Sequence, residues 1–155
     1  MRHLPAPSLS FLCDMELTVE KAHLPGTTPI GTRRIIRVTG GSLRGEKLNA
    51  EVIPGGDDWI TVREDGTIIQ DVRILLETTD KELIMMTYRG IRTGDAEVLK
   101  RLDNNEEVDP DAYYFRTSPI FETASEKYDW LNRRIFVSRG IRLPGKVNYS
   151  IYTVE

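Results

Sequence analysis

The chain has 155 residues, 39% of them hydrophobic and 29% charged, which is the balance of one globular domain and not of a disordered chain. Its 21 basic and 24 acidic residues are interleaved and give a net charge of −3, which argues against a nucleic-acid-binding surface, so we expect no nucleic-acid partner. The single cysteine, Cys13, excludes an intrachain disulfide bond, and its place in an alternating segment is typical of a buried, unreactive thiol.

The N-terminal residues show no pattern of a membrane or export segment. No apolar run approaches the ~20 residues that a membrane-spanning helix needs, so we expect no membrane partner. Residues 1–13 contain a basic residue and several apolar ones, but Pro5, Pro7 and polar residues interrupt the apolar stretch that a signal peptide requires. We therefore expect a cytoplasmic protein.

The clearest strand pattern near the start of the chain is Leu9–Glu20. Apolar residues occupy its odd positions and polar residues its even ones, with Leu12 as the one exception. This period of two is typical of a strand with one buried face. The following segment, Lys21–Thr32, contains two Pro and two Gly and is predicted to be a loop. Arg33–Thr39 is rich in β-branched residues and predicts a strand that ends at the Gly40–Gly41 pair.

The middle of the chain alternates between strand patterns and tight turns. Lys47–Ile53 alternates again and stops at a Pro-Gly-Gly turn, after which Trp59–Arg63 predicts a short strand. An Asp-Gly pair leads from that strand to Thr67–Thr78, and such a pair between two strand patterns is a strong hairpin signal. A second turn at 79–82 leads to the predicted strand Leu83–Arg92.

Helical patterns appear only in the later part of the chain, where Asp95–Leu102 and Ser125–Asn132 favour short helices. An acidic loop follows the first of them. Strand patterns occupy the rest of this part, at Ala112–Glu122, Arg134–Arg142 and Lys146–Val154. The last two strands form a predicted closing hairpin across a Leu-Pro-Gly turn.

These elements predict a mostly β fold with antiparallel connections, because two short helices cannot cover a parallel sheet. An antiparallel set of about eight to nine strands hides its edges completely by closing into a β-barrel, and a two-sheet β-sandwich is the alternative. We expect one β-barrel domain over 1–155, with one or two short helices and with 1–8 as a loosely ordered N-terminal segment. The interior of such a barrel is either filled by side chains or holds one small ligand.

Polar residues interrupt several predicted strands at positions where a packed core prefers aliphatic ones. Asp71 and Arg73 share one face of their strand, which is either an exterior ion pair or part of a polar cavity. Tyr114 and Arg116 also share a face. An arginine beside an aromatic residue suits recognition of a carboxylate or enolate, and pairing with an acidic neighbour is the alternative.

Asp58 lies between a Pro-Gly-Gly-Asp segment and Trp59. A carboxylate beside a tryptophan at the mouth of a barrel suits a general base, because an apolar setting raises its pKa. Most segments of this composition, however, are simple turns. The sequence leaves both interpretations open.

Several catalytic classes lack their motifs in this chain. His3 and His23 are the only histidines, which argues against a His-based triad and against a multi-histidine metal site. There is no GxSxG motif, no phosphate-binding glycine loop and no dinucleotide-binding fingerprint. We therefore expect neither a metal nor an organic cofactor.

Six segments together resemble a known family. They are GTRRIIRVTGG (31–41), PGGDDW (54–59), DVR (71–73), YRG (88–90), YFRTSPIFET (114–123) and YDWLN (128–132). In this order they are similar to the signatures of a family of small uncharacterised microbial proteins, domain of unknown function 3237, and the similarity runs from about Leu9 to the C-terminus. The resemblance implies a compact β-barrel with a central cavity, often in an oligomer, and brings no agreed reaction or catalytic residue.

The polar and aromatic positions of these segments define the candidate site. We expect the catalytic residues to be Asp58, Arg73, Arg116 and Glu122. We expect the ligand-binding residues to be Trp59, Asp71, Tyr88, Tyr114, Tyr128 and Trp130. In this interpretation Arg73 and Arg116 hold an anionic or enolising oxygen. Asp58 or Glu122 moves the proton, and the aromatic residues form an apolar wall.

The favoured function is a small-molecule-binding barrel that acts as a cofactor-independent isomerase, cyclase or lyase on a carbonyl- or carboxylate-bearing metabolite. One alternative is a carrier or sensor that binds without chemistry, and another is a protein-interaction module with a dry interior. We expect a small organic molecule as the partner. Exposed strand edges and apolar faces also favour a homo-oligomer.

Overall fold

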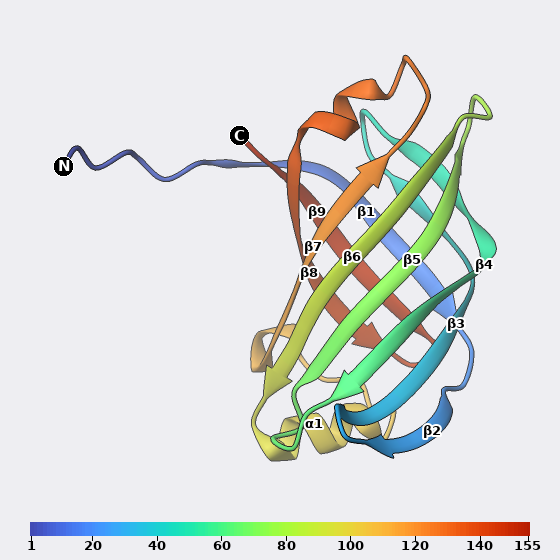
Figure 1. Ribbon diagram of the computed structural model, residues 1–155, viewed down its shortest axis with the longest axis vertical. Coiled ribbons are helices and arrows are strands. Elements are labelled where there is room, and N and C mark those ends of the chain that lie inside the picture. The colour runs from blue at the N-terminus through green and yellow to red at the C-terminus, as the bar shows by residue number, and fades with distance from the viewer.

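Nine strands dominate the computed structural model, which describes residues 1–155, and eight of them close into an antiparallel β-barrel (Figure 1). The strands are β1 (Leu9–Val19), β2 (His23–Thr28), β3 (Gly31–Arg44), β4 (Asn49–Val62), β5 (Ile68–Thr78), β6 (Leu83–Gly94), β7 (Tyr113–Glu122), β8 (Ile135–Leu143) and β9 (Lys146–Val154). Their order is β1-β9-β8-β7-β6-β5-β4-β3-β2, and pairing of β1 with β3 closes the ring and leaves β2 outside it. The predicted closed antiparallel barrel is confirmed.

Short helical segments lie at the two ends of the barrel (Figure 1). The helix α1 (Ala96–Asp103) lies at the end drawn at the bottom, and the 3₁₀ turn η2 (Asp129–Arg133) lies at the opposite end; a second 3₁₀ turn, η1, covers Pro110–Ala112. We call these the α1 end and the η2 end. The helix predicted at Asp95–Leu102 is confirmed, whereas that at Ser125–Asn132 is only the shorter turn η2.

Two predicted strand ends are bulges within longer strands. β3 continues through the Gly40–Gly41 pair and β4 continues through the Pro-Gly-Gly segment at 54–56, so the prediction that strands stop there was wrong. The pairing register shifts at both places, so each strand bends without ending. A Cβ atom on Gly41 would lie 2.1 Å from the carbonyl oxygen of Glu16, so only glycine lets β3 approach β1 this closely.

The prediction of a loop at Lys21–Thr32 was also wrong in part, because β2 forms within this segment and pairs with β3. β2 has one neighbour, so it is an edge strand, and its pairing with β3 is irregular between His23 and Gly26. An edge strand tolerates Pro25 at such an irregularity, since the missing N–H interrupts no continuous ladder. Pro and Gly in this segment therefore mark an irregular edge strand.

The hydrophobic core is one cluster of 27 buried residues inside the barrel. The alternation predicted for β1 places Cys13, Met15 and Leu17 in it, and burial raises the pKa of the Cys13 thiol to about 12. Leu9 and Phe11 break the prediction and are exposed, because the register between β1 and β9 shifts between Phe11 and Cys13. Such a shift moves side chains to the other face of the sheet.

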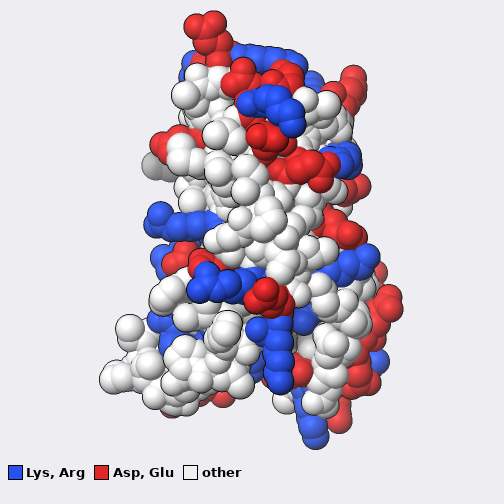
Figure 2. All heavy atoms as spheres, turned by 90° about the vertical axis from the view of Figure 1, so that its right-hand side faces the viewer, with Lys and Arg blue, Asp and Glu red and all other residues white.

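The surface carries both signs of charge. Figure 2 shows basic and acidic side chains interspersed over one face of the barrel. Residues 1–8 have no regular secondary structure and extend away from the barrel (Figure 1). None of the helical segments has the length and apolar character needed to cross a membrane.

Candidate functional site

A cavity of about 510 Å³ lies inside the barrel and reaches the α1 end. Its mouth is lined by the segment after β1, by the C-terminal residues of α1 and by the β8–β9 turn. Its wall is mainly apolar, with 13 hydrophobic residues among 23. Small-molecule sites commonly have volumes of roughly 300–1,000 Å³ and apolar walls with a few polar groups, so the cavity has the size and composition of a ligand site.

The alternation of β5 and β6 decides which side chains enter the cavity. On β5, Gln70 and Val72 point inward, so Asp71 and Arg73 point outward. On β6, which runs from the η2 end to the α1 end, Ile84 and Met86 belong to the packed core, whereas Tyr88 and Arg92 line the cavity. The barrel is therefore filled at the η2 end and hollow at the α1 end.

Asp58 of β4 is the acidic group deepest in this site, with only 8% of its surface exposed. Its Oδ1 atom accepts a hydrogen bond from the backbone N–H of Asp71 at 3.0 Å, and its Oδ2 atom accepts one from Nε2 of Gln70 at 3.2 Å. Burial raises the pKa of Asp58 to about 6, although these two bonds and the charge of Arg92 oppose the rise. A carboxyl group with this pKa exchanges protons readily near neutral pH.

Two tyrosines extend the polar cluster across the cavity. The hydroxyl of Tyr88 donates to that of Tyr149 at 3.1 Å, and Nε2 of Gln70 donates to the same Tyr149 oxygen at 3.2 Å. Burial raises the pKa of both phenols, so both stay protonated at neutral pH. Because the Tyr149 oxygen accepts both bonds, its own proton is free to be donated to a bound molecule.

Two glycines make room for these side chains. A Cβ atom on Gly90 would lie 2.6 Å from Oε1 of Gln70, and one on Gly140 would lie 2.9 Å from the ring of Phe115. The ring of Phe115 in turn packs edge-on against that of Tyr149, with 5.5 Å between their centroids. The position of Gln70 thus depends on the absence of a side chain at Gly90, and that of Tyr149 depends, through Phe115, on its absence at Gly140.

Two arginines line the cavity nearer its mouth. Arg92 is 9% exposed, has no carboxylate within ion-pair distance, and its Nε atom has no hydrogen-bond partner. Arg142 is anchored by bonds to the carbonyl oxygens of Leu143 and Lys146 and by a 3.4 Å bond to Oδ1 of Asn105. Burial, and then the charge of Arg142, lower the pKa of Arg92 from its usual value.

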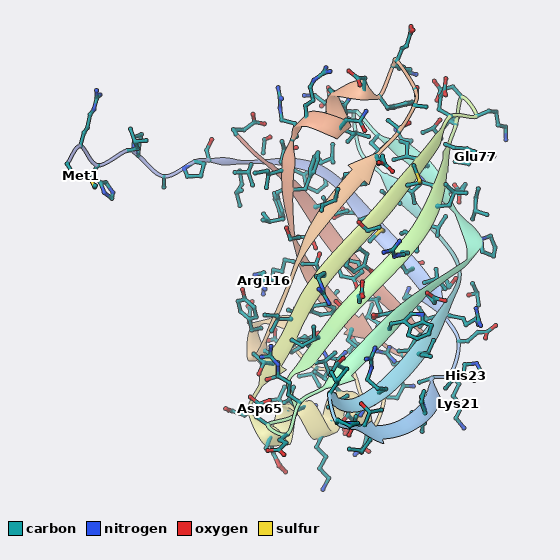
Figure 3. All side chains as sticks on the ribbon, viewed as in Figure 1. Met1, Lys21, His23, Asp65, Glu77 and Arg116 are labelled. Atoms are coloured by element: carbon teal, nitrogen blue, oxygen red, sulfur yellow. The ribbon has the colours of Figure 1, made fainter.

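Of the residues predicted for the site, Asp58 and Tyr88 line the cavity. Six others lie on the outer side of the barrel wall: Trp59, Asp71, Arg73, Tyr114, Arg116 and Glu122. Figure 3 shows Arg116 at this outer face, where its guanidinium lies 5.0 Å from the ring of Tyr114. The expected convergence of Arg73 and Arg116 on Asp58 therefore does not occur, because their neighbours Val72, Phe115 and Thr117 take the inward positions.

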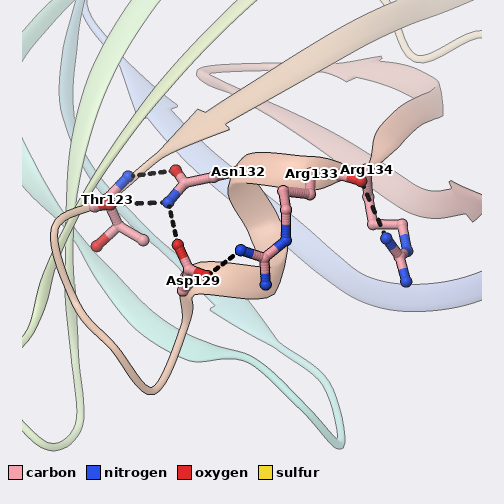
Figure 4. A network of polar contacts seen from close by, with 5 residues as sticks. All are labelled: Thr123, Asp129, Asn132, Arg133 and Arg134. Carbon is pink, nitrogen blue, oxygen red and sulfur yellow. Dashed lines mark hydrogen bonds and ion pairs between the residues drawn. The ribbon is translucent and has the colours of Figure 1, made fainter.

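Tyr128 and Trp130 lie at the η2 end, away from the cavity. The hydroxyl of Tyr128 donates to Oδ1 of Asp80 at 2.9 Å. Figure 4 shows how η2 is fixed nearby: Asn132 exchanges two 2.9 Å hydrogen bonds with the backbone of Thr123 and donates a third to Asp129. These contacts tie the turn to the end of β7, so we assign this region a structural role.

Sequence reasoning missed four cavity residues, Gln70, Arg92, Arg142 and Tyr149. A signal for Gln70 was present, because it lies between two apolar residues, Ile68 and Val72, on a face that also carries Ile74 and Leu76. Arg92 similarly lies on the strand face that carries Ile84, Met86, Tyr88 and Gly90. Polar residues on the apolar face, and not those on the polar face, pointed into the barrel. No group of three or more His, Cys, Asp or Glu side chains is placed to hold a metal ion.

The chain matches known proteins over almost its whole length. Residues 7–154 match the model of a family described as a protein of unknown function (DUF3237). A UPF0311 protein of Clostridium acetobutylicum is 40% identical over 140 residues, which cover 90% of this chain and 89% of that protein. The crystal structure of the conserved protein of unknown function RPA1785 from Rhodopseudomonas palustris has a TM-score of 0.93 and 31% identity, over 99% of this chain and 100% of that one.

A less similar relative has a name that states a reaction. The hydroalkoxylation enzyme phnH of Penicillium herquei is 29% identical over 126 residues, which cover 81% of this chain and 69% of that protein. A solved structure of an enzyme from the same fungus has a TM-score of 0.74 and 25% identity, over 100% of this chain and 99% of that one. The barrel is thus shared by proteins of unknown function and by an enzyme.

Proposed function

The chain belongs to the DUF3237 family, and we propose that it is an acid–base enzyme acting on a small carbonyl-bearing molecule held in the barrel cavity. The reaction is an isomerisation, a cyclisation or a related lyase step. One observation carries the proposal: Asp58 is buried in a ligand-sized cavity with its pKa raised to about 6, beside a tyrosine proton that has no acceptor in the protein. A base and a hydrogen-bond donor in one apolar site are the elements of enolate chemistry.

The proposed steps are those of an intramolecular addition. The Asp58 carboxylate takes the proton of a substrate hydroxyl, whose oxygen forms a bond to the β carbon of a C=C group conjugated to a carbonyl. The π electrons move to the carbonyl oxygen, which receives a hydrogen bond from Tyr149. Asp58 then returns its proton to the α carbon, so substrate and product are isomers and no co-reactant is consumed.

The relative from Penicillium herquei supports this class of reaction. Hydroalkoxylation, the activity in its name, adds an O–H group across a C=C bond, and such a step needs a proton to leave oxygen and a proton to reach carbon. A single carboxyl group with a pKa near neutral can do both.

Replacement of Asp58 by Asn tests the proposal. We expect the native protein to accelerate the cyclisation of 2′-hydroxychalcone to flavanone, followed by the loss of its long-wavelength absorbance, and Asp58→Asn to reduce that acceleration at least ~100-fold. The fold should survive, since the amide oxygen of Asn still accepts from the backbone of Asp71. Gln70 can turn its unpartnered Oε1 toward the new amide.

Asp71→Asn is the matched control, because Asp71 is the neighbouring carboxylate on the outer side of the same wall. It should leave the rate within about twofold of native. Equal rates for native protein and Asp58→Asn, or no acceleration by the native protein, would contradict the assignment of Asp58 as the base.

A carrier or sensor is the second candidate, and the mainly apolar cavity wall favours it. Such a protein binds an aromatic ketone in the cavity but releases it unchanged. Product analysis by liquid chromatography after incubation separates the two functions: binding without any conversion supports the carrier.

A further inference from the structure

Arg92 is a cavity group that the proton transfer above does not use. It projects from β6 into the hollow end of the barrel, where it is 9% exposed. Its Nε atom is buried without a partner, and no hydrogen bond or ion pair engages the rest of its guanidinium group. Its guanidinium lies over the ring of Phe115, with 5.9 Å between Cζ and the ring centroid.

The second arginine of this region, Arg142, adds its charge to the same end of the cavity. Its guanidinium is held by carbonyl oxygens and by Asn105, which are neutral groups. The nearby carboxylate of Asp103 is already engaged by Arg34 at 3.1 Å. Two guanidinium groups thus share a partly enclosed space without a carboxylate of their own.

A buried guanidinium without a partner is unfavourable, since arginine does not lose its proton under ordinary conditions and its desolvation is not offset. A bound ligand with an anionic group removes this cost, because it supplies the missing hydrogen-bond acceptor and the opposite charge. A planar guanidinium donates two parallel hydrogen bonds to a carboxylate, a geometry that a lysine or a neutral donor does not offer.

We propose that Arg92 and Arg142 form an anion-binding subsite at the α1 end of the cavity, and that the ligand is a small aromatic acid whose carboxylate binds there. The aromatic part then lies against Phe115 and Tyr149, deeper in the barrel. This inference rests on the proposed function for one point, that the reacting carbons reach Asp58. The binding itself is independent of any reaction.

The test compares two probes of the same shape, 2-naphthoate and its neutral amide, by isothermal titration calorimetry. We expect the native protein to bind the acid at least ~10-fold more tightly than the amide. Arg92→Met should remove most of that preference, and Arg142→Met should reduce it. Arg73→Met is the control, because Arg73 lies on the outer face of the wall; it should leave both affinities unchanged.

Equal affinities for the two probes, binding of neither, or an unchanged preference in Arg92→Met would overturn the inference. The comparison of the two probes needs no variant, so it stands even if a variant fails to fold. Acid binding without any chalcone cyclisation would support the subsite and count against the proposed reaction. Cyclisation that depends on Asp58, without any preference for the acid over the amide, would support the proposed reaction and count against the subsite.

Discussion

Asp58 illustrates how one residue of the site is set by opposing effects. Burial disfavours its charged form, while the bonds from Gln70 and the Asp71 backbone and the charge of Arg92 favour it. Burial is the largest of these, so the pKa rises from 3.8 to about 6. At neutral pH most of the molecules therefore carry Asp58 as a carboxylate, and this carboxylate is a stronger base than that of an exposed aspartate.

The same residue predicts a pH dependence of stability. Because its pKa is higher in the folded protein than in the unfolded chain, the folded state binds more protons, and it loses stability as the pH rises from about 4 to about 6. A change of this size corresponds to about 3 kcal/mol, at 1.36 kcal/mol for each pKa unit. The loss levels off about one pH unit above the folded-state pKa.

Asp58→Asn should abolish this contribution. Urea unfolding of the native protein and of Asp58→Asn between pH 4 and 7.5 measures it, since groups common to both cancel in the difference. We expect the variant to gain stability relative to the native protein as the pH rises, by about 3 kcal/mol at most. A difference that does not vary with pH would show that the pKa of Asp58 is not raised.

At the scale of elements, periodicity predicted most strands because each has one buried face, as the alternation of β1 and β5 shows. The sequence could not show that β3 and β4 continue through their glycine-rich bulges, since Gly40–Gly41 and Pro54–Gly56 have the composition of turns. What continues these strands is pairing with distant segments, β1 for β3 and β5 for β4.

The candidate site was predicted only in part for a related reason. Alternation gives two faces for each strand, and polar residues on the outward face, such as Arg73 and Arg116, resembled site residues as closely as inward ones did. Asp58 and Tyr88 were identified because they lie beside turns or aromatics in the recognised segments. Gln70 and Tyr149 interact across 79 positions of sequence, and local patterns carry no information on such a contact.

The seam between β1 and β3 is the element on which barrel closure depends. In Gly41→Ala the new Cβ atom would lie 2.1 Å from the Glu16 carbonyl oxygen, and φ at this position is +143°. We expect a loss of at least ~3 kcal/mol in the free energy of unfolding, with faster hydrogen exchange at the amides of β1 and β3.

Gly26→Ala is the control for this seam. Gly26 also has a positive φ, +104°, but a Cβ atom there would meet nothing within 4 Å. It should lose only the energy of backbone strain, about 1–2 kcal/mol. An equal loss in the two variants would mean that close approach of β1 and β3 does not limit the barrel.

At the scale of the whole molecule, the barrel divides its interior between stability and binding. Large side chains such as Met86, Phe121 and Phe136 fill the η2 end, while the α1 end keeps about 510 Å³ open. The polar cluster around Asp58 lies in the open part, where it is enclosed by the closed sheet. The surrounding sheet and the mainly apolar lining lower the local dielectric, which strengthens the electrostatic interactions of such a cluster.

The pH dependence of 2′-hydroxychalcone cyclisation, corrected for the uncatalysed rate, is the sharpest test of the role of Asp58. If Asp58 is the base, kcat/KM of the native protein rises with pH through an apparent pKa of about 6 and reaches a plateau above it, since the carboxylate is the active form. A profile that is flat between pH 5 and 7.5, or one that falls over that range, would contradict the claim that this carboxylate moves the proton.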